Sequence, residues 1–300
     1  MDKEINKIFI ISAGRTGTKL FGDHLEKTIP NSFSEHEPDN VDLFNFDNLI
    51  KNIKRQSFKE LFILKGLGQL GSRNISLRYL NNTFSKEKAL EKIKYERRWI
   101  EGCKFYFEAN QQLYGLTNIL PEIPNSKVLL FFRDPRDWVR SIINKGKAYT
   151  DKDILYKINV GGFKRISPEN LDKKSENWKN YNQFQRICWV WNYINTNFYN
   201  SINGNNQNIR HYFFEDIFIK NNENTIRDFL EFALDEYFEE EYVARLQKML
   251  QNKVNENTKQ EFHKWHDWDK KHCQDLHYFC GDLMQKLGYG NETEWLEKIQ

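Results

Sequence analysis

Short apolar runs alternate along the chain with segments in which apolar residues recur at helical spacing. Lys7 to Ser12 is a continuous apolar run that ends at a glycine-containing turn, the pattern of a buried parallel strand. Further apolar runs predict strands at 58–66, 127–132 and 211–214, and KFYF at 104–107 is strand-like. Helical spacing predicts helices over 18–27, 87–98, 183–200 and 225–237, and another that starts near Pro135. The alternation predicts an α/β fold, with a mostly parallel central sheet flanked by helices.

The 300 residues are expected to form a single domain, 1–300, because no linker or internal repeat divides them. A chain of this length buries enough surface to fold without disulfide or metal staples. Residues 151–181 are polar, rich in Lys and Asn, and contain Gly161-Gly162. They are predicted to form a mobile lid or a surface insertion.

Charge and cysteine content narrow the classes of partner. The net charge is +3, from 45 basic and 42 acidic residues, which argues against nucleic-acid binding but allows a local basic pocket. The chain has no transmembrane-length apolar stretch and no secretory signal pattern, so we expect a soluble cytoplasmic protein. No CxxC pair or zinc-finger spacing is present, so the cysteines are expected to be inert thiols in a reducing compartment: Cys103, Cys188, Cys273 and Cys280.

The most informative segment is SAGRTGTK at 12–19, between the first predicted strand and the first predicted helix. Two glycines and two threonines in this place can form a nest of backbone N–H groups, aided by the helix N-terminus, that holds phosphate or sulfate oxygens. Arg15 can place its planar guanidinium on two oxygens of the same group. The candidate binding residues here are Gly14, Arg15, Thr16, Gly17, Thr18 and Lys19.

A Walker A loop, GxxxxGK[ST], is the nearest common alternative. Gly17 is followed by Thr18 and not by lysine, and Lys19 precedes Leu20 where a Ser or Thr would hold magnesium. A P-loop kinase-like phosphotransferase that uses ATP and magnesium is therefore the second hypothesis for the function. The segment could also be a generic strand-to-helix turn that binds no phosphate.

A second polar segment, RDPRDWVRS at 133–141, follows the predicted strand KVLLFF directly. Taken alone it could be an ordinary helix N-terminus with a stabilising proline. At the end of a buried strand, however, Arg133 can supply charge and Ser141 a hydroxyl to one anionic group. Arg136 and Arg140 could assist, or could simply be solvated helix charges.

Together the two segments resemble the PAPS-dependent sulfotransferases, in particular their bacterial and carbohydrate-type branch. Residues 15–19 (RTGTK) are similar to that family's 5′-phosphosulfate loop, although Lys19 stands where Ser or Thr is usual. Arg133 and Ser141 have the spacing of its 3′-phosphate motif, an Arg at a strand end with a Ser eight residues later. The segments at 211–217 and 280–290 resemble the later parts of the same fold.

The resemblance implies a P-loop-NTPase-like sulfotransferase fold and 3′-phosphoadenosine-5′-phosphosulfate (PAPS) as donor, with adenosine 3′,5′-bisphosphate as product. It implies metal-free transfer to a hydroxyl or amine of a small molecule or glycan, such as a carbohydrate or glycolipid. Arg15 is the candidate for stabilising the leaving oxygen. In the same family, a loop that closes over the nucleotide corresponds to 259–269, which makes Lys259, Lys264 and Trp265 candidate nucleotide contacts.

A hydroxyl acceptor needs a base within hydrogen-bond reach. The segment EHEP at 35–38 is similar to an acidic-proline element of the family, which makes Glu37 the first candidate and His36 the second, unless the segment only caps a loop. Glu108, before Asn110, is an alternative base, acceptor contact or helix cap, and Lys65 at the end of the predicted strand 58–66 is a further contact. Without a working base the chain would be a non-catalytic nucleotide-binding module.

Overall fold

The computed structural model describes residues 4–39, 46–57, 59–150, 152–153, 165–171, 177–251 and 261–300. Within these residues five strands form one sheet: β1 Asn6–Ser12, β2 Ser32–His36, β3 Phe105–Ala109, β4 Ser126–Phe132 and β5 Ile209–Phe213. Their order is β2-β3-β1-β4-β5, and all neighbouring strands are parallel. The predicted fold class is confirmed, with β1 at the centre of the sheet and the candidate phosphate loop directly after it.

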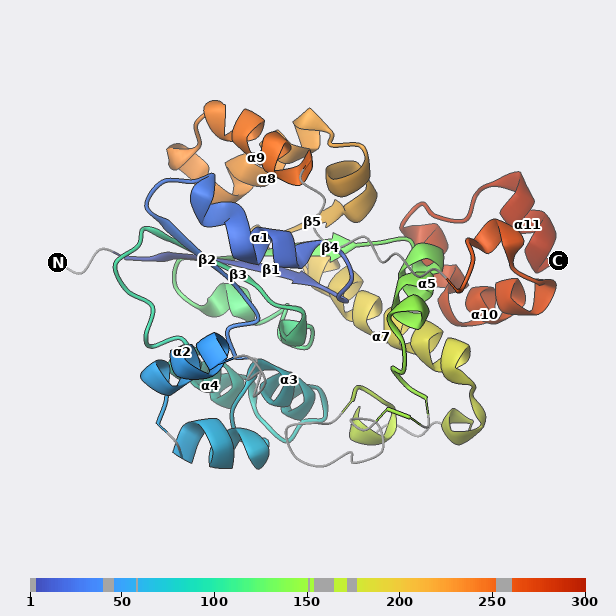
Figure 1. Ribbon diagram of the computed structural model, residues 1–300, viewed down its shortest axis with the longest axis horizontal. Coiled ribbons are helices and arrows are strands. Elements are labelled where there is room, and N and C mark those ends of the chain that lie inside the picture. The colour runs from blue at the N-terminus through green and yellow to red at the C-terminus, as the bar shows by residue number, and fades with distance from the viewer. Residues whose placement is uncertain are drawn as a thin grey trace.

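Helices cover both faces of this sheet. They are α1 Thr18–His24, α2 Phe46–Arg55, α3 Ser72–Leu80, α4 Lys86–Glu96, α5 Pro135–Lys145, α7 Gln183–Asn203, α8 Glu223–Leu234, α9 Glu241–Gln251, α10 Lys270–Lys286 and α11 Thr293–Ile299. In Figure 1, α1, α8 and α9 lie above the sheet, and α3, α4 and α7 lie below it. Among the described residues, no helix combines the length and the apolar character needed to cross a bilayer.

Alternation along the central strands explains the two-sided core. Ile8 and Ile10 of β1 pack with the helices α1, α8 and α9, whereas Phe9 and Ile11 pack with α3, α4, α5, α7 and α10. Successive side chains of a strand point to opposite faces, so an unbroken apolar run is what a strand buried on both faces requires. Most of the predicted strands and helices are confirmed for this reason.

The strand predicted at 58–66 is wrong, because Lys59–Leu64 is π-helical and Lys65 continues in helical conformation. A short apolar run cannot by itself distinguish a strand from a buried helix. One edge strand of the sheet is β2, which was not predicted because its polar sequence SFSEH gave no strand signal.

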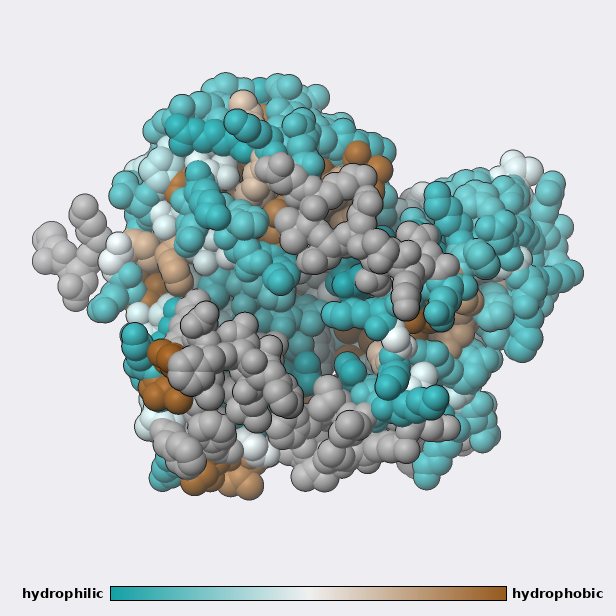
Figure 2. All heavy atoms as spheres, viewed as in Figure 1, coloured by the Kyte–Doolittle hydropathy of each residue, from teal (hydrophilic) through white to brown (hydrophobic). Residues whose placement is uncertain are grey.

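The outer surface is mainly polar. In the view of Figure 2 most of the surface is hydrophilic, and hydrophobic atoms gather at the lower left, where Figure 1 places α2 and the residues that follow it. Among the side chains that the structure describes in this part of the chain, the large apolar ones that are exposed are Ile50, Ile53, Ile63 and Leu67. All four cysteines are free thiols; three are buried and Cys103 is half-buried.

Gly22 allows α1 to pack directly on the end of β2. A Cβ at Gly22 would lie 2.6 Å from the backbone N and Cα of His36, whereas a Cβ at Gly66 would have nothing within 4 Å. We therefore predict that Gly22→Ala lowers the free energy of unfolding by about 1–3 kcal/mol, because the helix must move away from the strand.

The matched control is Gly66→Ala, which we expect to be neutral or slightly stabilising because Gly66 lies in a helical segment. Urea unfolding of both variants measures the difference. Equal unfolding midpoints for the two variants would show that α1 and β2 are not in this close contact.

Candidate functional site

The candidate site lies at the edge of the sheet where the parallel strands end. His36 pairs with Ala109, Ala109 with Ile10, and Ser12 with Phe131, so β2 and β3 end close to the ends of β1 and β4. From β1 the chain fills one side of the sheet with β2 and β3, then crosses to β4 on the other side. In open parallel sheets, ligands bind outside the carboxyl ends at such a change of direction.

The loop after β1 takes a conformation that depends on its glycines. Gly14, Arg15 and Gly17 have φ values of 84°, 56° and 69°, in the left-handed region that favours glycine. A Cβ at Gly14 would lie 1.9 Å from Oε1 of Gln111, and one at Gly17 would lie 2.5 Å from the ring of Phe218. The backbone conformation therefore favours glycine at both positions, and at Gly17 the ring of Phe218 also leaves no room for a side chain.

The structure joins the two predicted phosphate loops directly. Nε of Arg15 donates to Oγ of Ser141 at 3.0 Å, although the two residues are 126 positions apart. The guanidinium of Arg133 donates to the carbonyl oxygen of Arg15, and Nε1 of Trp138 donates to the carbonyl oxygen of Gly14 at 2.7 Å. Residues predicted from two separate motifs thus meet in one place, with the indole of α5 as an additional link that the sequence did not indicate.

Positive charge dominates this meeting point. Burial lowers the pKa of Arg15 and of Arg133, and in Arg133 the charges of Arg15 and Arg140 lower it further against the opposing effect of Asp137 and Glu215. Both guanidinium groups nevertheless remain cationic at neutral pH. Oγ1 of Thr16 and Nε of Arg133 are buried without a hydrogen-bond partner in the part of the chain that the structure describes. The site thus combines excess positive charge with unused donors, which suits an anionic ligand.

His36 is the last residue of β2, and Glu37 follows it at the same edge of the sheet. The backbone N–H of Glu37 donates to the carbonyl oxygen of Ala109 at 3.0 Å, and its side chain is buried. Burial lowers the pKa of His36; Glu37 and Asp23 oppose this effect, while Lys19 and Lys145 add to it.

Lys145 was not predicted as a site residue. Burial lowers its pKa, Arg15 and Lys19 lower it further, and Glu37 opposes them. Lys145 lies one helical turn after Ser141, on the same face of α5. That i, i+4 spacing is the sequence signal that could have identified it.

A network of hydrogen bonds supports the end of β4. Asp134 caps α5 by accepting from the backbone N–H of Arg136 at 2.8 Å, and the backbone N–H of Asp134 donates to Glu215 at 3.1 Å. Arg136 is buried, forms an ion pair with Glu292, and lies over the ring of Trp265. It is therefore a structural residue here and not a solvated helix charge, and Trp265 packs against it.

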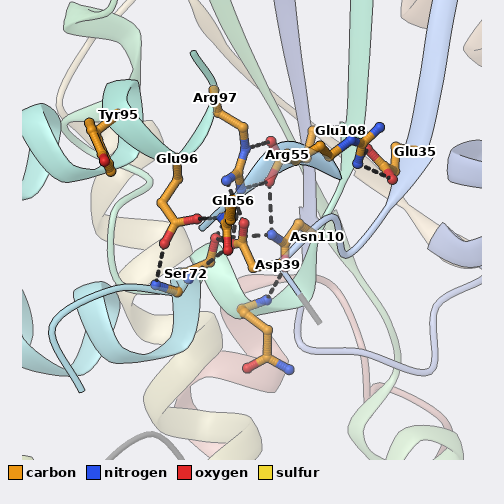
Figure 3. A network of polar contacts seen from close by, with 12 residues as sticks. Glu35, Asp39, Arg55, Gln56, Ser72, Tyr95, Glu96, Arg97, Glu108 and Asn110 are labelled. Carbon is orange, nitrogen blue, oxygen red and sulfur yellow. Dashed lines mark hydrogen bonds and ion pairs between the residues drawn. The ribbon is translucent and has the colours of Figure 1, made fainter. Parts of the chain in front are cut away.

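Glu108 is committed to a buried ion pair. Arg97 binds both of its carboxylate oxygens, and Nδ2 of Asn110 donates to Oε1 at 2.8 Å (Figure 3). Burial raises the pKa of Glu108, and Arg97 opposes this effect. Glu35 forms a separate ion pair with Arg55 at 2.8 Å. Glu108 and Glu35 are thus each paired with an arginine, and Glu37 lies close enough to Lys145 to oppose the lowering of its pKa.

Lys65 was expected at a strand end on the ligand-binding rim, which is wrong because its segment is helical. Its Nζ instead donates to the backbone carbonyl of Asp39 at 3.1 Å.

Lys264 is exposed, at the start of the short helical turn Trp265–Asp267. Lys259 lies outside the described residues, as does much of the predicted lid at 151–181. In the described part of that segment, Ile166, Leu171 and Trp178 are buried.

Among the described residues, no group of three or more His, Cys, Asp or Glu side chains is arranged to hold a metal ion.

Comparison with known proteins gives likeness at the level of the fold. The chain is similar to the crystal structure of a sulfotransferase from Alicyclobacillus acidocaldarius, with a TM-score of 0.45 and 13% identity over 98% of this chain and 99% of that one. It is similar to the sulfotransferase domain from the curacin biosynthetic pathway, with a TM-score of 0.43 and 13% identity over 96% and 99%. No protein-family model and no curated protein sequence matches the chain.

The carboxylate of Asp39 provides a pH-dependent contribution to stability. Burial alone would raise its pKa, but Arg97, Lys65 and hydrogen bonds from Arg97 and Ser72 together lower it to about 2 from 3.8. A depressed pKa stabilises the folded state above the unfolded pKa, and this contribution is lost as the pH falls toward the folded value. We predict that the stability difference between the wild type and Asp39→Asn shrinks by about 2 kcal/mol between pH 5 and pH 2.

Urea unfolding of both proteins at intervals across this range measures the effect. A difference that stays constant with pH would show that Asp39 is not held as a carboxylate by Arg97.

Proposed function

We propose that this protein is a sulfotransferase that moves the sulfuryl group of PAPS to an acceptor hydroxyl or amine. The observation that carries the proposal is the contact of Arg15 with Ser141, reinforced by that of Arg133 with the backbone of Arg15. PAPS carries anionic groups at the 5′ and the 3′ positions of its ribose, and a site that joins two loops with one arginine each is suited to hold both. Residues 14–19 would bind the 5′-phosphosulfate, and Arg133 with Ser141 would bind the 3′-phosphate.

The reaction needs only the transfer of one group and one proton. The acceptor oxygen attacks sulfur while the bond from sulfur to the 5′-phosphate oxygen breaks in line, and the acceptor proton passes to a base. Positioning and cationic stabilisation of the oxygens do most of the catalysis in such displacements. Arg15 is suited to stabilise the leaving oxygen, and Glu37 to accept the proton, with His36 as the second candidate.

The acceptor in this proposal is a small molecule or a glycan, such as a carbohydrate or glycolipid. Cation-assisted transfer by the arginines requires no metal, because a sulfuryl group carries less negative charge than a phosphoryl group. A kinase-like reaction with ATP and magnesium is less well supported, because the residue after Gly17 is Thr18 and not the lysine of a Walker A loop.

Arg15 and Arg133 are expected to differ in what their loss does. We predict that Arg15→Ala lowers PAPS turnover about 10²–10³-fold, because a cation acting on the leaving oxygen is lost. Arg133→Ala should mainly weaken the binding of adenosine 3′,5′-bisphosphate, about 10–100-fold, because a charged hydrogen-bond donor to the 3′-phosphate is lost.

Turnover is measured as release of adenosine 3′,5′-bisphosphate from PAPS, and binding by calorimetry. Arg210→Ala serves as the control, since Arg210 is paired with Asp228 at the surface. Near-normal turnover of Arg15→Ala would remove the role assigned to Arg15.

The base is tested by Glu37→Gln, which keeps the size of the side chain and removes its ability to accept a proton. We predict a loss of turnover of about 10²–10⁴-fold, because general base catalysis is removed, with unchanged affinity for adenosine 3′,5′-bisphosphate. Full turnover in this variant, together with loss in His36→Gln, would transfer the role to His36. Full turnover in both variants would leave the chain without the proposed base.

A further inference from the structure

Arg97 is the centre of a buried ion network on the side of the sheet covered by α3 and α4. Its Nη1 lies 2.5 Å from Oδ1 of Asp39, and its Nε lies 2.5 Å from Oε2 of Glu108. Figure 3 shows the guanidinium between these two carboxylates, which come from different segments of the chain. The side chains of Arg97 and Glu108 are only 3% and 0% exposed. One buried cation thus joins the end of β3 to the segment that follows β2.

Asp39 is held by more than Arg97. Its carboxylate accepts hydrogen bonds from the backbone N–H of Ser72 at 2.9 Å and from the Ser72 hydroxyl, and its backbone carbonyl accepts from Nζ of Lys65 at 3.1 Å. The Ser72 hydroxyl in turn accepts from Arg97 at 3.0 Å. The segment after β2 is therefore bound to the start of α3, to Lys65 and to the end of α4.

Glu37, the proposed base, lies between two points that are fixed by adjacent residues at the end of β3, Ala109 and Glu108. On one side its N–H donates to the carbonyl oxygen of Ala109, and on the other Asp39 is joined through Arg97 to Glu108. Glu37 itself has a φ of 44°, in the left-handed region. A non-glycine residue keeps such a conformation only when its surroundings impose it.

We propose that Arg97 is a positioning residue for Glu37: by holding Asp39 against Glu108 it fixes the backbone that presents the Glu37 carboxylate to the site. This inference rests on the proposed function, in which Glu37 is the base. A base displaced by about 1 Å can lose on the order of 10²-fold in rate, so the position of this backbone matters for turnover.

Stability alone is a poor explanation for the network. Burying several charges costs desolvation energy that their mutual attraction only partly repays, and well-packed apolar residues often stabilise a core as well or better. What the ion network supplies in addition is a fixed geometry between two segments, which is the property that a catalytic carboxylate needs.

The test uses Asp39→Asn, because Arg97→Ala would leave two buried carboxylates without their cation. In Asp39→Asn, Arg97 still pairs with Glu108. The matched control is Glu60→Gln, which also replaces a carboxylate by an amide, in the helical segment Lys59–Leu64. Glu60 is buried and pairs with Arg98 at 3.0 Å, and its pKa, like that of Asp39, is lowered to about 2. Ser72→Ala is a second, milder variant that removes one hydroxyl from the network.

Three measurements are made on each full-length variant. Hydrogen exchange followed by mass spectrometry reports the protection of the amides of His36, Glu37 and Asp39, the three residues in 36–39 that carry a backbone N–H. PAPS turnover, with water as acceptor, and calorimetric binding of adenosine 3′,5′-bisphosphate report function. We expect Asp39→Asn to exchange at least tenfold faster at 36–39 and to lose about 10–100-fold in turnover with unchanged bisphosphate affinity. Ser72→Ala should show the same changes to a smaller extent, and Glu60→Gln should show neither.

The outcomes separate the two proposals. Wild-type protection at 36–39 in both Asp39→Asn and Ser72→Ala, or equal loss of turnover in Glu60→Gln, would overturn the positioning role of Arg97. A wild-type protein that neither turns over PAPS nor binds adenosine 3′,5′-bisphosphate would instead overturn the proposed function, whatever the exchange rates show.

Discussion

Parallel pairing of β1 with β3 and β4 is the constraint on which the rest of the structure depends. It brings the ends of strands that are far apart in the sequence to one edge, and each end carries a polar segment. Hydrogen bonds and close packing then position the loop that follows β1. Trp138 donates to the carbonyl oxygen of Gly14, and the Gln111 side chain lies directly against Gly14. The loop after β1 is thereby contacted by the short helical turn Gln111–Leu113 that follows β3, and by α5.

Charged side chains are arranged differently in two regions near this edge of the sheet. Arg15, Arg133 and Lys145 gather where the loops of β1 and β4 meet, and no buried carboxylate is bonded to either guanidinium within the described residues. Below the sheet the opposite holds, because Arg97 is bonded to both Asp39 and Glu108. The first arrangement leaves positive charge for a ligand, and the second uses it to join segments of the chain. Glu37 lies between the two regions.

The sequence identified the parts of the fold that depend on local pattern. The sequence predicted the buried strands β1 and β4 and the segments that follow them. Each strand is an unbroken apolar run that is followed directly by a polar segment, and the segment after β1 also contains glycines. β2 was missed because its sequence SFSEH is short and polar, as an edge strand allows. The segment at 59–64 was mistaken for a strand because its apolar run fits a buried helix equally well.

The local sequence pattern could not predict the role of a residue whose partner is distant in the sequence. Nothing near Glu108 indicates that Arg97 occupies its carboxylate, and nothing near Ser141 indicates that Arg15 binds its hydroxyl. These contacts arise from the order of the strands in the sheet, which apolar periodicity does not encode.

The central claim is that this edge of the sheet binds a nucleotide with separate 5′ and 3′ anionic groups. Calorimetric titration of the protein with adenosine 3′,5′-bisphosphate, beside ATP with magnesium, tests it most directly. The account predicts tight binding of the bisphosphate and weak or no binding of ATP with magnesium. Preference for ATP with magnesium would contradict it and would favour a kinase-like phosphotransferase.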